Sequence, residues 1–276
     1  MQHPCSTERS KRVPQRPRFA ALLVSNPSPG TNRFHLNLPE TRIAVHRTCG
    51  SSTRENNTYF QNPGYPSPFR GMGTCHLLVY KVRNDICQVR LDFLEFQTAG
   101  PSLRADTAGQ CLTDRFTVAG MHNMAQVPQV CGSNQGQHMY LDVDMEEAPI
   151  MVNMIIMGGD ISRKWNIRIA QIPCGILTAP VGCLQWFTGL HGEVKSFNFD
   201  ENSVHLADQH YTVCVRSESD FCSIEWRAVG SNEENSTVTG AFSISDGMPS
   251  GAFPVADRFL CEISGKPGVT EIGKAR

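Results

Sequence analysis

Apolar and polar residues alternate along several short stretches in the middle of the chain. Val89, Leu91 and Phe93 alternate with Arg90 and Asp92, which is the two-residue period of a strand with one buried face. The same period returns in residues 139–143 and again in residues 165–169. The pattern therefore predicts short β-strands over these segments.

Clusters of glycine, proline and asparagine separate these stretches. They occupy residues 62–66, 71–73, 132–136 and 158–160, and each supplies backbone geometry for a chain reversal. Residues 150–157 are almost continuously apolar, which favours a strand buried on both faces over a short helix. Many short strands between turns predict an all-β fold, an antiparallel β-sandwich of the jelly-roll type.

Residues 1–48 do not share this pattern. They are rich in proline and show little periodicity, so we expect a disordered or irregular segment. The apolar run at residues 19–24 is shorter than the core of about 7–15 residues that a signal peptide needs. Two interpretations stay open: the true leader lies upstream of this chain, which we favour, or a non-standard start is joined to secreted domains. No stretch approaches the roughly 20 apolar residues of a membrane-spanning helix, so we expect no membrane span.

Composition and charge narrow the class of function. With 276 residues, 40% of them apolar, the chain has room for two ordinary domains with real cores. The 25 basic and 26 acidic side chains almost cancel, so the chain lacks the positive field that would attract nucleic acid. We therefore expect no nucleic-acid partner.

The chain has eleven cysteines, too many to be incidental thiols in a cytosolic protein. Structural zinc sites need closely spaced ligand pairs, but the closest cysteines, Cys214 and Cys222, are eight positions apart. Disulfides are therefore the favoured explanation, and disulfides persist in oxidising compartments.

Cysteines, turns and strands return in the same order in the second half of the chain. Three cysteines of the first half align with three of the second: Cys49, Cys75 and Cys87 with Cys183, Cys214 and Cys222. Such an internal repeat predicts two similar domains. We place their boundary near Pro173 and Cys174.

The first copy resembles a CUB domain, an extracellular β-sandwich module, and the whole is similar to secreted tandem-CUB proteins of arthropods. The resemblance rests on these positions: Cys49, residues 59–66 (similar to the family's SPNYP turn), Cys75, strand 89–93, residues 111–116, Cys131 with Gly132, and strand 165–169. It implies a CUB-like domain over residues 49–173 and a partial CUB-like domain over residues 174–276, shortened or atypical.

The resemblance also implies disulfide pairs. In the first copy it pairs Cys49 with Cys75 and Cys111 with Cys131. Cys87 opens one predicted strand and Cys174 closes another, so these two lie at one end of the sheet if the strands are antiparallel neighbours, and we expect a third bridge. In the second copy, Cys183–Cys214 corresponds to the first pair. The resemblance assigns no disulfide partner to three cysteines: Cys5, Cys222 and Cys261.

Many CUB domains bind calcium, so the resemblance raises the question of whether this chain has a calcium site. Asp114 and Asp160 match two of the family's aspartate ligands, but the glutamate position falls near Ala99, which has no carboxylate. Calcium prefers six to eight oxygen ligands. Two interpretations stay open: Asp114 and Asp160 cap turns, which we favour, or they hold calcium. No other cofactor is expected.

Catalysis and glycosylation complete the inventory. No G-x-S-x-G pentapeptide marks a nucleophilic serine, and His76 and His138 lie on predicted strands, where surface or satisfied histidines are commoner than bases. We predict that the chain is not an enzyme. Sequons at Asn56 and Asn235 predict glycosylation of a secreted protein.

These observations predict a secreted, extracellular module without catalytic activity that binds an extracellular protein or glycan through its loops. The alternatives are a regulatory CUB fragment of an extracellular protease whose catalytic domain lies outside this chain, and a structural component of the extracellular matrix.

Overall fold

The fold consists of short β-strands. The computed structural model describes residues 44–120, 127–143, 148–199, 204–219, 224 and 269–272, and within these ranges it contains twelve strands and no helix. In the part of the chain described, no helix could cross a membrane. The strands are β1 (Val45–Arg47), β2 (Ser51–Thr53), β3 (Thr58–Gln61), β4 (Gly73–Val79), β5 (Ile86–Gln97), β6 (Asp114–Ala119), β7 (His138–Asp142), β8 (Ile150–Ile156), β9 (Lys164–Pro173), β10 (Cys183–Phe187), β11 (Thr212–Arg216) and β12 (Val269–Ile272).

The described residues fall into two compact units. The larger unit holds residues 44–186 and 195–214, and the smaller holds residues 187–194, 215–219, 224 and 269–272. The predicted domain boundary at residue 173 stays a prediction. Within the larger unit, packing continues past that residue into the segments 183–186 and 195–214.

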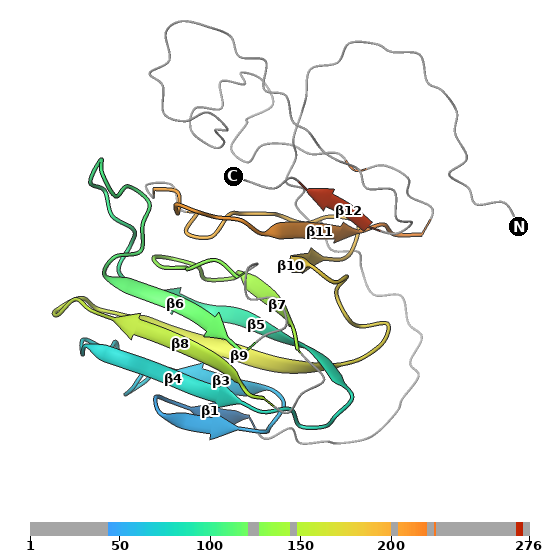
Figure 1. Cartoon of the computed structure of the whole chain (residues 1–276), viewed down its shortest axis with the longest axis horizontal. Coiled ribbons are helices and arrows are strands. Elements are labelled where there is room, and N and C mark those ends of the chain that lie inside the picture. Colours follow the sequence, from blue (N-terminus) through green and yellow to red (C-terminus); the bar gives the residue numbers. More distant parts are fainter. Residues whose placement is uncertain are drawn as a thin grey trace, which may run out of the picture. The chain divides into compact units, whose positions relative to one another are not determined.

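Two sheets form the body of the larger unit (Figure 1). One has five strands in the order β1-β3-β9-β5-β7, and the other has four in the order β2-β4-β8-β6. The long central pair β5 and β9 runs antiparallel, with Leu91 opposite Ile169 and Phe93 opposite Ile167. The predicted CUB-like β-sandwich is therefore correct as a fold class.

Two strand pairs at the edges of the sheets are parallel, in an otherwise antiparallel sandwich. Strand β1 lies parallel to β3, and β2 lies parallel to β4. Parallel neighbours need a crossover connection. Here each crossover runs through a strand of the opposite sheet: the chain passes from β1 through β2 to β3, and from β2 through β3 to β4. Residues 45–47, inside the segment expected to be irregular, form an edge strand by this route.

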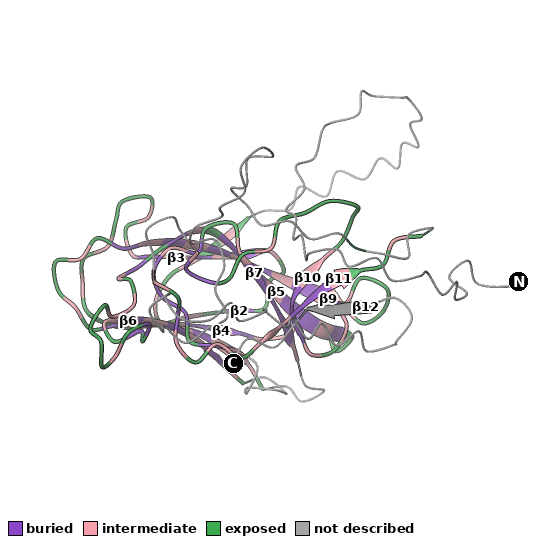
Figure 2. Cartoon of the chain, turned by 90° about the horizontal axis from the view of Figure 1, so that it is seen from above, coloured by how far each residue is buried: buried purple, intermediate pink, exposed green. Residues whose placement is uncertain are grey.

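The core lies between the two sheets, where the buried face of each strand meets the other layer (Figure 2). Phe93 stands at its centre, with ring centroids 5.0 Å from Phe96 and 5.3 Å from Phe116. Such edge-to-face aromatic pairs add to the stabilisation from burial. The alternation in the sequence thus identifies the core face of β5 and β9.

Strand β8 corrects one detail of the sequence analysis. Residues 150–157 were expected to be buried on both faces, but only alternate residues of β8 are buried, including Val152 and Met154. Met151 and Ile155, which alternate with the buried residues, are partly exposed. An apolar run therefore occupies both faces of a strand whose sheet is covered on one face only.

The segment after Cys174 adds residues to the same core. Leu184, Phe197 and Leu206 belong to the cluster of buried apolar residues, and Tyr211 packs against it. The ring of Phe197 lies 6.4 Å from that of Phe93 and 5.2 Å from that of Tyr211. Burial raises the pKa of Tyr211 to about 12.

Candidate functional site

Three loops meet at one end of the sandwich. They connect β3 to β4, β5 to β6 and β8 to β9, and the strand registers bring them together, since Gln97 pairs with Lys164 and Asp114 pairs with Ile156. Loops on a rigid scaffold are a frequent location of binding residues. This end is therefore the first place to look for a site.

A buried ion pair fixes two of these loops. Arg163 Nε lies 2.6 Å from Asp114 Oδ2, and Arg163 Nη2 lies 2.9 Å from Asp114 Oδ1. Both side chains are completely buried. The Ala99 N–H also donates to Asp114 Oδ2 at 2.8 Å, and Arg163 donates to the carbonyls of Gly158 and Ile161. The pair thereby links the β5–β6 loop to the β8–β9 loop.

Arg163 is a site residue that the sequence motifs did not predict. The residue continues the buried face of β9, two positions before Trp165 and four before Ile167, and Asp114 likewise shares its face with Phe116. A charged side chain at a buried position needs an opposite charge. The alternation therefore contained a signal that Arg163 and Asp114 would pair.

Exposed apolar side chains surround this fixed framework. Met72, Leu112 and Met157, which we call the loop patch, are 67%, 44% and 51% exposed. The loops that carry them lie next to one another, because Met72 Sδ lies near Gly159 and the Met157 N–H donates to the Thr113 carbonyl at 2.9 Å. Apolar groups held in water on a rigid framework are typical of interaction surfaces.

The two residues predicted for calcium have different surroundings. Asp114 already accepts three N–H donors through its carboxylate. Asp160 is exposed and has φ 56°, a conformation that Asp adopts more readily than most residues. Among the described residues, no group of three or more His, Cys, Asp or Glu side chains could hold a metal. The donor set does not fit calcium, and coordination by Asp114 and Asp160 stays a prediction without structural support.

Among the described residues, four disulfides join the cysteines paired in the sequence analysis: Cys49–Cys75, Cys87–Cys174, Cys111–Cys131 and Cys183–Cys214. Cys111–Cys131 lies at the base of the β5–β6 loop, and Cys87–Cys174 closes the opposite end of β5 and β9. Cys5, Cys222 and Cys261 lie outside the described residues. Disulfides of this density agree with an oxidising, extracellular compartment.

The two predicted glycosylation sites differ in what the structure describes. Asn56 is exposed, and its side chain bridges to β9, since Nδ2 donates to the Gln171 carbonyl at 3.2 Å and Oδ1 accepts from the Gln171 N–H at 2.8 Å. A glycosylated amide keeps one N–H and could keep this bond. Asn235 lies outside the described residues. Glycosylation at both sites stays a prediction.

The surroundings of His138 indicate a structural role rather than that of a general base. Its Nε2 accepts a hydrogen bond from the Trp186 N–H at 3.1 Å, and its ring lies edge-on to Tyr140. Burial and, to a lesser extent, the charge of Arg90 lower its pKa to about 4, while Asp92 opposes the shift. The neutral ring therefore anchors β10 through the Trp186 backbone.

A second polar group lies at the start of β9. Glu95 accepts a hydrogen bond from the Tyr65 hydroxyl at 2.6 Å, and Lys164 Nζ lies 2.6 Å from its other oxygen. The hydrogen bond to Lys164 lowers the pKa of Glu95, and the bond to Glu95 raises the pKa of Tyr65. These shifts keep each group in its ordinary charge state at neutral pH, so the cluster orders the turn rather than transferring protons.

Comparisons with known proteins bear on this site. A family model described as the animal CUB domain matches residues 180–262. No curated protein matches the sequence.

Two solved structures are similar. The full extracellular region of zebrafish Gpr126/Adgrg6 is 14% identical at a TM-score of 0.33, over 48% of this chain. The CUB1-EGF-CUB2 domains of rat MASP-1 are 11% identical at a TM-score of 0.34, over 64% of this chain and 73% of that one. The chain spans only 15% of the zebrafish structure.

The family match falls on the second copy, the one expected to be partial. Much of that copy lies outside the described residues, and the presence of two tandem copies stays a prediction. CUB domains are generally non-catalytic modules, and together with the disulfides the match indicates an extracellular interaction module. Residues 180–262 are therefore similar to the animal CUB domain, over less than half of the chain.

Proposed function

We propose that the chain is a secreted recognition module without catalytic activity that binds an extracellular protein through the loop patch. The observation that supports this most is the exposure of Met72 and Met157. Met157 lies on a loop fixed by the buried pair of Asp114 and Arg163, and Met72 lies on the β3–β4 loop, where Phe69 exchanges backbone hydrogen bonds with Arg163. Methionine side chains adapt to irregular partner surfaces. Burial of such side chains contributes roughly 1.5–3 kcal/mol each, so the patch supplies a small central contact.

The patch favours a protein partner over a carbohydrate. The exposed residues that define it offer apolar contact area and no hydrogen-bonding side chain. Arg115 adds a charge at the margin, with its Nη2 3.9 Å from Met157 Sδ. Interfaces of proteins are enriched in Met and Arg relative to the rest of the surface.

A binding assay with matched variants tests this proposal. The secreted chain carrying Met72→Ser and Met157→Ser is compared with the chain carrying Leu177→Ser, a residue 72% exposed near the Cys87–Cys174 end of the sandwich. After capture from extracellular fluid, a partner identified by mass spectrometry should bind about tenfold or more weakly to the double variant and normally to the control. Equal binding by both variants would remove the loop patch from the function.

A further inference from the structure

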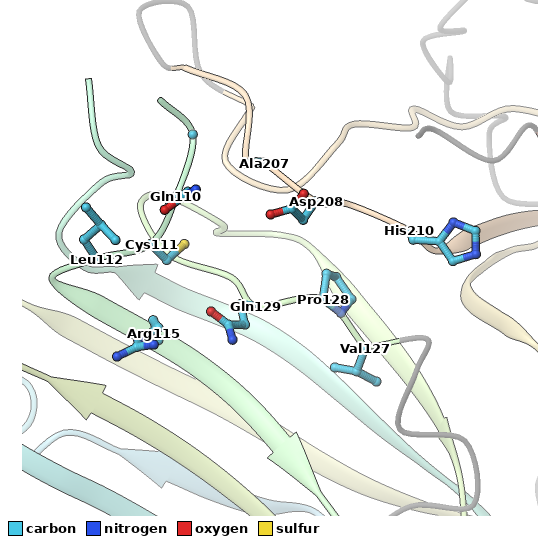
Figure 3. Close-up of a pocket in the computed structure, with 11 residues that line it drawn as sticks. Gln110, Cys111, Leu112, Arg115, Val127, Pro128, Gln129, Ala207, Asp208 and His210 are labelled. Atoms are coloured by element: carbon cyan, nitrogen blue, oxygen red, sulfur yellow. The ribbon is translucent and has the colours of Figure 1, made fainter. Parts of the chain in front are cut away.

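A pocket lies on the larger unit, formed by segments far apart in the sequence (Figure 3). Its volume is about 430 Å³, within the range of about 300–1,000 Å³ of sites for small ligands. The walls come from the end of the β5–β6 loop, from β6, from residues 127–129 and from residues 207–210. It is therefore a candidate site of its own, next to the loop patch, with which it shares Leu112.

The walls of the pocket are held in place by hydrogen bonds to backbone groups and by a disulfide. The Ala207 N–H donates to the Gly109 carbonyl at 2.8 Å, and Gln209 Nε2 donates to the carbonyl oxygens of Gln129 and Ala207. The Cys111–Cys131 disulfide fixes the β5–β6 loop at the rim. Lining side chains such as Gln110 and Asp208 are consequently presented on a fixed backbone.

The polar lining suits hydroxyl groups. Figure 3 shows the carboxylate of Asp208 and the amides of Gln110 and Gln129 around the same opening. An amide offers both donors and an acceptor, and a carboxylate accepts from two neighbouring hydroxyls. All three residues are exposed to solvent, so a ligand can reach them.

The charge of the pocket argues for a neutral ligand. Arg115 and Asp208, which both line it, contribute opposite charges that cancel. Leu112, Val127 and Pro128 add apolar surface for the C–H face of a ring. We propose that this pocket binds a neutral sugar unit of a glycan.

Saturation-transfer NMR on the full chain tests the proposal. The probes are free glucose, galactose, mannose and N-acetylglucosamine, with glucuronate and an Nα-acetyl-lysine amide as charged alternatives. At least one neutral sugar should receive saturation at millimolar concentration. If none does, or if only a charged probe does, the proposal is wrong.

Variants then locate the binding. Asp208→Asn removes the charge and keeps the shape, and Asn tolerates the φ of 55° at this position. Asp208→Asn and Gln129→Ala should each weaken sugar binding about tenfold or more, and Gln97→Ala, an exposed amide on β5, should not. Gln110→Ala provides a further test if Asp208→Asn loosens the segment. Sugar binding unchanged in all pocket variants would overturn the assignment.

The two binding proposals can fail independently. The loop-patch variant with Met72→Ser and Met157→Ser retains the pocket lining, so it should keep its sugar binding even where its protein partner is lost. The reverse holds for Asp208→Asn, because Asp208 is not part of the patch.

Discussion

The sandwich of residues 44–174 and the segment of residues 195–214 enter the same core by different means. The sandwich strands bond through regular ladders, as where β4 faces β8 over seven consecutive pairs. The described residues of this segment form no strand before β11, yet Phe197 is only 2% exposed and Leu206 only 7%. Burial in this protein therefore does not require a ladder.

Side-chain hydrogen bonds take the place of the ladder in this segment. The Asn198 N–H donates to Asn134 Oδ1 at 2.7 Å, and Asn198 Oδ1 accepts from the Ser133 N–H at 3.0 Å. Gln137 Nε2 donates to the carbonyls of Lys195 and Ser196. Because buried backbone groups need partners, these few side chains determine where an irregular segment can dock.

The largest expected effect concerns the sandwich itself. Arg163→Met leaves Asp114 buried without its counter-charge, which should lower the free energy of unfolding by about 3–5 kcal/mol. Asp114→Leu combined with Arg163→Met removes both charges and should recover much of the loss. Urea denaturation measures both variants. A single variant that costs less than about 1 kcal/mol would show that the loops do not depend on the pair.

The pH dependence of stability tests whether His138 anchors β10 through Trp186. Its pKa in the folded protein is about 4, below the ordinary 6.5, so the unfolded chain binds the proton first as pH falls. The stability contributed is complete above about pH 6.5 and is lost as pH falls toward 4, by roughly 3 kcal/mol in total. Urea denaturation between pH 4 and pH 7 should show a weaker pH dependence in His138→Gln. An identical slope in both proteins would contradict the role of the neutral ring.

Alanine substitutions at two glycines test the contact that Asn198 of the segment 195–214 makes with the sandwich. Gly132 and Gly136 have φ of 81° and 82°, but a Cβ at Gly132 would clash with Asn198 Oδ1, whereas one at Gly136 would meet nothing within 4 Å. Gly136→Ala should cost about 1–2 kcal/mol from backbone strain alone. Gly132→Ala should cost more, since Asn198 must move. Equal losses in thermal or urea denaturation would indicate that Asn198 does not dock there.

Calcium should have the smallest effect. Because Arg163 occupies both oxygens of Asp114, adding millimolar calcium or a chelator should shift the midpoint of thermal unfolding by less than about 1 °C. A shift of several degrees that disappears in Asp160→Asn would restore the calcium site suggested by the family resemblance.

The difference between the two regions also explains what the sequence could predict. Strands β5 and β9 follow from alternation, as in Val89, Leu91 and Phe93, because a half-buried strand imposes a period on its residues. The docking of Phe197 leaves no periodic pattern in the sequence, since Asn198 and Gln137 make isolated hydrogen bonds to partners distant in the sequence. The pair of Asp114 and Arg163 lies between these cases: each charge falls on a predicted buried face, but only the fold brings the two together.

Hydrogen exchange in the full chain tests most directly whether residues 195–214 complete the core of the sandwich. Phe197→Ala removes a buried ring against Phe93, and Phe199→Ala removes the same ring from a half-buried position two residues later. In Phe197→Ala, amide exchange in β5 should accelerate by about 100-fold or more, with little change in Phe199→Ala. Exchange in β5 within about twofold of the unmodified chain would contradict the account.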